Sequence, residues 1–340
     1  MSRFVITTAI LIAAGYVNPA RGQGSATTLV VGLENVVEYQ VDTSDLSKWG
    51  TNPNSTTGKI AQGMGVGCAG VPVMAYGDIV SVNGAPARGT YVSRAVAVCM
   101  SPTPTAGLFA MADISANSLR DETYYILQSD GATPIGTIMV NGLNGNVSPR
   151  PPGPPVGGQN YTIVGGTGAF LGARGQKGNG TGSAINVRLA SITEDAANRR
   201  QNGGGRGSFT FYVVPMFRPE VVITPNGPAV THSDFSLVSA AKPAAAGEIL
   251  SLFATGLGPT RTSLAPGQPF PSSPLAVVNS PIDVTVSGKS AEVLGAVGSP
   301  GAVDSYQVNF RVPPDMSPGA ATIQISAAWI PGAPVSIAVK

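Results

Sequence analysis

Residues 161–175 read YTIVGGTGAFLGARG, an apolar strand that runs into a group of glycines. A dinucleotide-binding turn begins in this way, and it needs glycines at three-residue intervals followed by a helix. Gly165 and Gly168 have that spacing, but the third position is Leu171. Residues 172–183 then contain five glycines, which destabilise a helix. The stretch therefore predicts a chain reversal between antiparallel strands, in which glycines supply positive φ angles.

Strand-like segments lie on both sides of this turn. Apolar and polar residues alternate in the segments 34–42, 90–100, 122–128, 135–142, 183–191 and 208–214. Alternation with a period of two means that one face of a strand is packed, while the other is wet or lines a cavity. In the first segment Val37 and Tyr39 are expected on the packed face and Glu38 on the opposite face. So many strands in about 190 residues favour a closed barrel or a sandwich.

We therefore expect an all-β chain, with an antiparallel β-barrel or sandwich over residues 25–215. Gly165, Gly166 and Gly168 are its expected turn residues, and Phe170 is expected to plug one end of the barrel. Prolines mark a linker at 216–228. Residues 229–340 form a second series of strands, about 12 residues apart, and this spacing fits an immunoglobulin-like β-sandwich.

The first residues indicate the compartment. Arg3 precedes an apolar run of 14 residues, 4–17, and the small residues Ala20 and Gly22 follow it. This is the pattern of a secretory signal peptide, here 1–22, and the run is too short for a comfortable membrane span. No later segment approaches about 20 uninterrupted apolar residues, so no transmembrane segment is expected in the mature chain.

Two cysteines, Cys68 and Cys99, are expected to form one disulfide if the chain is exported, and two buried free thiols are the alternative. A closed loop of that length would stabilise the fold by roughly 3 to 4 kcal/mol. With one histidine and two cysteines in the chain, a zinc site is not expected, nor is any other metal or cofactor.

Charge excludes nucleic acid as an expected partner. Only 11% of residues are charged and the net charge is +2, whereas phosphate binding needs a clustered basic surface. Arg199, Arg200 and the nearby Arg206 are interpreted as part of a solvated, glycine-rich loop.

The turn carries a resemblance to a family. Residues 161–176, YTIVGGTGAFLGARGQ, and the upstream segment 127–142, LQSDGATPIGTIMVNG, are similar to the signature region of allene oxide cyclases and dirigent proteins. The resemblance implies an eight-stranded β-barrel whose lumen binds an apolar small molecule. In plant members the barrel steers a cyclisation or a radical coupling. Arg174 matches the arginine of the dirigent motif, and it either points to the lumen or faces water.

A second resemblance covers the C-terminal part. Residues 240–260 and 281–326, with the pattern TGLGP…QVNFRVP…GAATI, resemble the C-terminal β-sandwich module of exported acidobacterial (Solibacter-type) proteins. It implies an exported bacterial protein with an accessory tail, located outside the cell or at its surface, and no catalytic role for the module.

Candidate ligand-binding residues are few. A carboxylate beside an arginine in an apolar barrel can move a proton or stabilise a developing charge. The candidates for such a lumen group are Arg94, Asp113, Arg120, Asp121, Glu122 and, from the dirigent resemblance, Arg174. The single histidine, His232, is followed by Ser233 and Asp234, but adjacent residues of an extended chain point apart, so they are interpreted as surface residues and not as a triad.

These observations favour an exported bacterial protein, non-catalytic or weakly catalytic, whose barrel binds an apolar small molecule or a surface component and whose C-terminal module is an accessory. One alternative is a cyclase- or dirigent-like enzyme that shapes a reactive small molecule. Another is a structural or adhesive surface protein.

Overall fold

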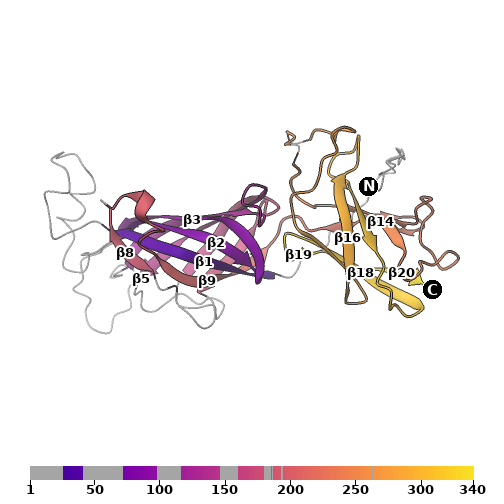
Figure 1. Ribbon diagram of the computed structural model, residues 1–340, viewed down its shortest axis with the longest axis horizontal. Coiled ribbons are helices and arrows are strands. Elements are labelled where there is room, and N and C mark those ends of the chain that lie inside the picture. Colours follow the sequence, from indigo (N-terminus) through magenta and orange to yellow (C-terminus); the bar gives the residue numbers. More distant parts are fainter. Residues whose placement is uncertain are drawn as a thin grey trace, which may run out of the picture.

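The computed structural model describes residues 26–40, 72–97, 116–145, 160–179, 185, 187–192, 194–261, 263–265 and 267–340. These residues form two nine-stranded sheets and a two-stranded ribbon, with one short 3₁₀ turn, Ala196–Asn198 (η4), and no α-helix. Figure 1 shows the two parts of the chain side by side along the long axis. The all-β prediction is confirmed. The predicted signal peptide and both cysteines, Cys68 and Cys99, lie outside the described residues.

The N-terminal sheet closes into an eight-stranded antiparallel barrel, as predicted. Its strands follow the order β2-β3-β4-β5-β6-β7-β9-β1, and β1 also pairs with β2. Their bounds are β1 Thr27–Gln40, β2 Pro72–Val82, β3 Ala85–Ala97, β4 Ala116–Leu127, β5 Pro134–Gly145, β6 Asn160–Gly168, β7 Arg174–Asn179 and β9 Gly205–Val214. The ninth strand of the sheet, β8 (Arg188–Ser191), lies parallel to the last four residues of β1.

The barrel has two different ends. At the end that we call the turn end, short connections join β2 to β3, β4 to β5 and β6 to β7. At the opposite end, the loop end, β1, β3 and β5 finish, and β2, β4 and β6 begin. The connections between those strands at the loop end, 41–71, 98–115 and 146–159, lie outside the described residues.

Residues 161–175 run from β6 through the connection 169–173 at the turn end into β7. The expectation that Gly165 and Gly166 lie in the turn is wrong, because they pair with Met139 and Ile138 within the sheet. The two strands run antiparallel, with Tyr161 opposite Lys177, and no helix follows Leu171. Gly168 has a φ of 61°, in the left-handed region that favours glycine. A Cβ on Gly166 would lie 2.3 Å from the carbonyl oxygen of Phe170, so backbone packing also requires a glycine there. Phe170 is 1% exposed and belongs to the barrel core.

Strand β1 contains a bulge that changes which residues face the lumen. Asn35 has a φ of 52°, and the pairing of β1 shifts register beside it. Val36 lies on the inner face, because a Cβ added to the inward-facing Gly77 would lie 3.0 Å from its Cγ2. Glu38, two residues further on, also faces inward and pairs with the buried Arg120. Val37 and Tyr39 are buried and Glu38 is on the opposite face, as the alternation predicts, and the bulge makes that opposite face the one that lines the lumen.

The segment 194–204 packs against the outside of β1 and β2 through one carboxylate. Asp78 accepts hydrogen bonds from Asn35 Nδ2 (2.9 Å), Arg199 Nη2 (2.6 Å) and Arg200 Nη2 (2.9 Å). The Arg199 side chain is only 11% exposed. The interpretation of Arg199 as a solvated loop residue is therefore wrong, because it joins two segments of the barrel wall.

The C-terminal sheet has the order β10-β14-β17-β16-β15-β18-β19, with β13 on β14 and β20 on β18. The bounds are β10 Glu220–Val221, β13 Val230–Thr231, β14 Ile249–Thr255, β15 Ile282–Val286, β16 Lys289–Gly298, β17 Tyr306–Arg311, β18 Gly319–Ala327, β19 Ile330–Pro331 and β20 Val335–Val339. The ribbon is β11 (Ile223–Thr224) and β12 (Gly227–Pro228). The sequence predicts a linker over 216–228, whereas β10 within it pairs with β14 and buries Val221.

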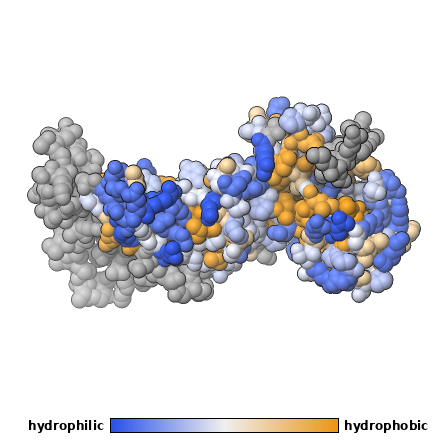
Figure 2. Space-filling model, viewed as in Figure 1, coloured by the Kyte–Doolittle hydropathy of each residue, from blue (hydrophilic) through white to orange (hydrophobic). Residues whose placement is uncertain are grey.

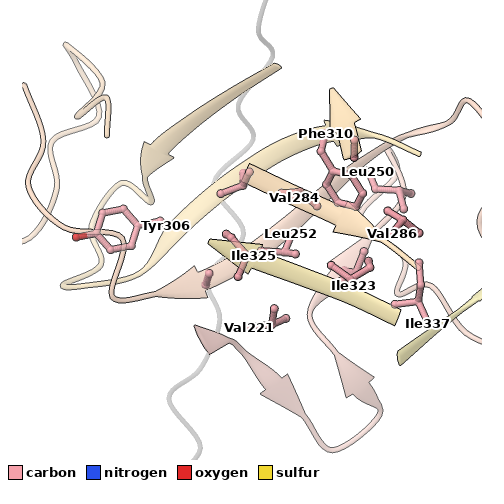
Figure 3. Close-up of a cluster of buried hydrophobic side chains, with 14 of the residues drawn as sticks. Val221, Leu250, Leu252, Val284, Val286, Tyr306, Phe310, Ile323, Ile325 and Ile337 are labelled. Carbon is pink, nitrogen blue, oxygen red and sulfur yellow. The ribbon is translucent and has the colours of Figure 1, made fainter. Parts of the chain in front are cut away.

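A single apolar core holds the C-terminal unit together. The first residues of β16 pair with β15 and its later residues pair with β17, so the sheet folds over through this strand. Buried side chains from both parts meet in one cluster, including Leu250, Phe310, Val284 and Ile323 (Figure 3).

The C-terminal unit covers the turn end of the barrel. Ala328 and Ile330, beside the start of β19, are buried in the barrel core cluster, and Trp329 packs against it. Asn279 Nδ2 donates to the carbonyl oxygen of Pro134 at 3.0 Å, and Gln128 Nε2 donates to the carbonyl oxygen of Asn279. In Figure 1, β19 lies on the side of the C-terminal unit that faces the barrel.

Candidate functional site

The inner face of β4 changes from charged to apolar along the barrel axis. From the loop end to the turn end, its inward residues are Arg120, Glu122, Tyr124 and Ile126, which are 6%, 3%, 0% and 1% exposed. Apolar side chains fill the barrel near the turn end, among them Leu29, Ile79, Ile138, Ile163 and Phe170. Polar groups thus gather in the half of the lumen toward the loop end.

The centre of this group is an ion pair that solvent does not reach. Lys177 Nζ lies 2.7 Å from Glu122 Oε2, and each side chain is 1% exposed. Two tyrosines complete the coordination of the carboxylate: Tyr124 Oη donates to Oε2 at 2.8 Å and Tyr91 Oη donates to Oε1 at 3.2 Å. Glu122 therefore accepts three hydrogen bonds from three different strands. We call Glu122, Lys177, Tyr91, Tyr124 and Tyr161 the lumen cluster.

Aromatic rings surround the ammonium group of Lys177. Its Nζ lies 3.4 Å from the ring centroid of Phe209 and 4.3 Å from that of Tyr161. Ring faces attract cations, so this arrangement offsets part of the cost of removing the ammonium from water. Tyr124 packs edge-to-face on Phe211, with centroids 4.8 Å apart, and closes the cluster toward the turn end.

Burial shifts the protonation equilibria of the cluster. Burial lowers the pKa of Lys177, while the charge of Glu122 opposes this shift. Burial and the nearby Glu122 charge raise the pKa of Tyr91 and of Tyr124 well above the usual value. The tyrosines accordingly remain protonated hydrogen-bond donors near neutral pH, and the amine of Lys177 is closer to its neutral form than a lysine in water.

A second ion pair lies nearer the loop end. Arg120 Nη2 is 2.5 Å from Glu38 Oε2, and the two side chains are 8% and 12% exposed. Burial would lower the pKa of Arg120, but the charge of Glu38 raises it overall, so the guanidinium stays charged. Among the described residues, Arg120 and Lys177 thus balance the charges of Glu38 and Glu122 in the lumen.

Two further hydroxyl groups, those of Tyr161 and Ser93, lie in the lumen. Burial raises the pKa of Tyr161, so its hydroxyl keeps its proton near neutral pH and can donate a hydrogen bond. Ser93 is opposite Glu122 in the β3–β4 register and is 1% exposed. It is close enough to the Tyr91 hydroxyl to influence its pKa. Its Oγ has no hydrogen bond of ordinary length among the described residues. A bound molecule can form hydrogen bonds with both hydroxyl groups.

The structure brings together only part of the set expected from sequence. Arg120 and Glu122 are in the lumen. Arg94 and Asp121 pair with each other at 2.8 Å on the outer face, where their side chains are 74% and 51% exposed. They cannot contact a molecule in the lumen, because alternation along a strand turns them away from Glu122.

The two remaining candidates are Arg174 and Asp113. Arg174 is exposed and donates through Nη1 to the carbonyl oxygens of Val164 (2.7 Å) and Ala173 (3.0 Å), so it supports the β6–β7 connection. Asp113 lies outside the described residues.

Lys177 and Glu38 were not among the residues selected from sequence. Lys177 lies in a stretch with glycines at every second or third position, GARGQKGNG, which looks like a loop. A signal was present, because Ala173, Gly175 and Lys177 alternate with Arg174 and Gln176 in the two-residue period of a strand.

The sequence predicts a surface position for His232, but the structure buries it. It is 6% exposed, its Nδ1 lies 2.6 Å from Glu248 Oε1 and its Nε2 lies 3.1 Å from the carbonyl oxygen of Lys242. Ser233 and Asp234 do not contact it; Asp234 pairs instead with Lys242. The histidine ties two segments of the C-terminal unit together, and no triad forms.

Within the described part of the chain, no group of three or more histidine, cysteine or acidic side chains is arranged to hold a metal ion. Among the same residues there is no helix with the length and apolar character needed to cross a bilayer. Comparison of the chain with models of protein families, with curated proteins and with solved structures found no match.

Proposed function

We propose that the barrel binds a small molecule in the half of its lumen toward the loop end. The ligand has an apolar body and at least one polar group that reaches the lumen cluster. The observation that carries this proposal is the solvent-free ion pair Glu122–Lys177, with tyrosine hydroxyls and one free serine around it.

The energetics of the pair support a functional role. Removing two charges from water costs several kcal/mol per ion, and apolar residues of similar volume often give equal or greater stability. A barrel that needed only a stable core would gain nothing from Glu122 and Lys177. Buried, mutually perturbed titratable groups are instead typical of binding and active sites. Outside the lumen, hydrophilic residues cover much of the visible face of the barrel (Figure 2).

The wider identity of the protein is part of the proposal. An allene oxide cyclase- or dirigent-like barrel is supported by the closed eight-stranded architecture and by the glycine-rich β6–β7 connection. An immunoglobulin-like sandwich is supported by the way β16 carries the C-terminal sheet over one core. Export from a bacterial cell is supported by the charged, apolar and small-residue pattern of residues 1–22.

A catalytic barrel is the second candidate. Glu122 accepts hydrogen bonds from both an amine and two phenols, so a proton can move within the cluster over distances of 2.7 to 3.2 Å. Such a cluster suits acid–base steering of a reactive small molecule, as in a cyclase- or dirigent-like enzyme.

The test is to identify what the lumen holds. The full-length protein is purified, small molecules are extracted from it and analysed by mass spectrometry, and the affinity of the compound found is measured by titration. Glu122→Gln is expected to weaken binding by about 10- to 100-fold, because a hydrogen bond to a charged group contributes about 1.5–3 kcal/mol.

Asp121→Asn is the matched control, since Asp121 is the next residue of β4 and points outward. Its affinity should equal that of the unmodified protein. A barrel that retains no compound, and that binds no apolar probe in titration, would instead favour the structural or adhesive alternative.

A further inference from the structure

We propose that Lys177 is a nucleophile that captures aldehydes or ketones as a Schiff base, so that the ligand of the lumen is a carbonyl compound with an apolar body. This inference rests on the proposed function, because the carbonyl compound must first enter the lumen.

The surroundings of Lys177 are those of a reactive amine. Its Nζ is buried in an aromatic pocket made by Phe209 and Tyr161, at 3.4 and 4.3 Å from the ring centroids. The only described carboxylate that pairs with it is Glu122. An amine reacts with a carbonyl group only in its neutral form, and removal from water favours that form. Burial lowers the pKa of Lys177, in agreement with this placement.

Glu122 is placed to manage the protons of such a reaction. At 2.7 Å it can take one proton from the ammonium, which leaves Lys177 neutral and Glu122 as a carboxylic acid. Tyr124 and Tyr91 hold the carboxyl group in position from two other directions. Tyr161, whose ring lies beside Lys177 Nζ and whose hydroxyl keeps its proton, is a group that can donate a hydrogen bond to the carbonyl oxygen of the ligand.

The step balances without an oxidant or a reductant. The Nζ lone pair attacks the carbonyl carbon, a C–N bond forms, and the oxygen takes the proton held by Glu122 to give a carbinolamine. Nζ returns a proton to Glu122. The carboxylic acid then protonates the hydroxyl group, which leaves as water while the C=N bond forms. The product is a protonated imine paired with the Glu122 carboxylate, so in total one ammonium group and one carbonyl group become one iminium group and one water molecule.

The experiment is reductive trapping on the full-length protein. The protein is incubated with hydrocinnamaldehyde, sodium borohydride is added to reduce any imine to a stable secondary amine, and peptide mapping by mass spectrometry locates the adduct. We expect roughly tenfold more adduct on Lys177 than on any other lysine, since exposed lysines are almost fully protonated near neutral pH. Equal labelling of Lys177 and the exposed Lys242 and Lys289 would overturn the proposal.

Two variants sharpen the result. Lys177→Arg keeps the positive charge but cannot form an imine, and it should lose the principal adduct. Lys289→Arg, which changes a lysine paired with Asp315 on the surface, should keep it. If Lys177→Arg does not fold, the mapped position of the adduct in the unmodified protein decides the question alone.

Binding is followed separately, by native mass spectrometry with hydrocinnamyl alcohol, which has the same body but no carbonyl group. If the alcohol binds and the aldehyde leaves no adduct on Lys177, the Schiff base is excluded and the binding function stands. If neither molecule binds, the binding proposal fails for this class of ligand, and the carbonyl proposal fails with it.

Discussion

Glu122 and Lys177 hold opposite charges where water does not reach them, so each depends on the other. Removing one charge leaves its partner buried without compensation. We expect Glu122→Gln and Lys177→Met each to lower the free energy of unfolding by about 3–5 kcal/mol.

The double variant Glu122→Gln/Lys177→Met should be more stable than either single one, because the amide oxygen still accepts from one of the two tyrosines and no unpaired charge remains buried at this position. Urea unfolding of the four proteins, combined as a double-mutant cycle, gives the coupling between the two residues. Additive losses would show that the pair is not coupled.

Asp78 holds the wall of the barrel in a pH-dependent way. Burial would raise the pKa of Asp78, but hydrogen bonds from Arg200, Arg199 and Asn35 lower it far below its ordinary value. A depressed folded-state pKa gives stability that is fully present above the unfolded pKa of about 3.9 and is lost as pH falls toward the folded value.

Asp78→Asn should therefore be less stable at neutral pH, by about 2–3 kcal/mol for the lost charged hydrogen bonds, and its stability should fall less between about pH 5 and pH 2. Thermal unfolding of both proteins across that range measures the difference. Parallel pH profiles would mean that Asp78 is not the group that titrates.

At the level of single elements, two neighbouring glycines near the end of strand β6 differ in the space around them. A Cβ on Gly166 would lie 2.3 Å from Phe170 O and 2.6 Å from Thr137 O, both backbone atoms that cannot move alone. A Cβ on Gly165 would meet nothing nearer than Arg174 Nη1, at 3.9 Å.

We expect Gly166→Ala to destabilise the protein by about 1–3 kcal/mol and Gly165→Ala to change its stability by less than about 0.5 kcal/mol. Denaturant unfolding compares the two. An equal effect of the two substitutions would show that close backbone packing at Gly166 does not determine the stability of the protein there.

In the whole molecule, the contact between the two units should couple their unfolding. Ile330 belongs to the C-terminal unit but is 1% exposed within the barrel core cluster. Ile330→Ala removes buried apolar contacts, and we expect a loss of about 2–4 kcal/mol, together with a broader or divided transition in calorimetry.

Ile223→Ala is the control for this substitution, since Ile223 is 48% exposed and lies in the β11–β12 ribbon. It should leave the unfolding temperature nearly unchanged. A single sharp transition for Ile330→Ala, shifted no more than that of the control, would show that the interface does not couple the units.

Local patterns accounted for much of the architecture. The five glycines of 172–183 disfavour a helix wherever they occur in a chain. Alternation puts Tyr91 and Ser93 on one face of one strand and Phe209 and Phe211 on one face of another, as the structure has them. These properties depend on residues near one another along the chain. An all-β chain could therefore be predicted from local patterns, whereas the choice of a barrel over a sandwich came from the resemblance of the glycine-rich segment.

The composition of the lumen could not be predicted in the same way. The bulge at Asn35 moves Glu38 to the inner face, and closure of the barrel brings Glu122 of β4 to Lys177 of β7 across 55 residues of sequence. Sequence reasoning found Arg120 and Glu122 but grouped them with Arg94 and Asp121, which lie on the outer face. Alternation assigns residues to two faces, but strand register and barrel closure decide which face is the inside and which charges meet there.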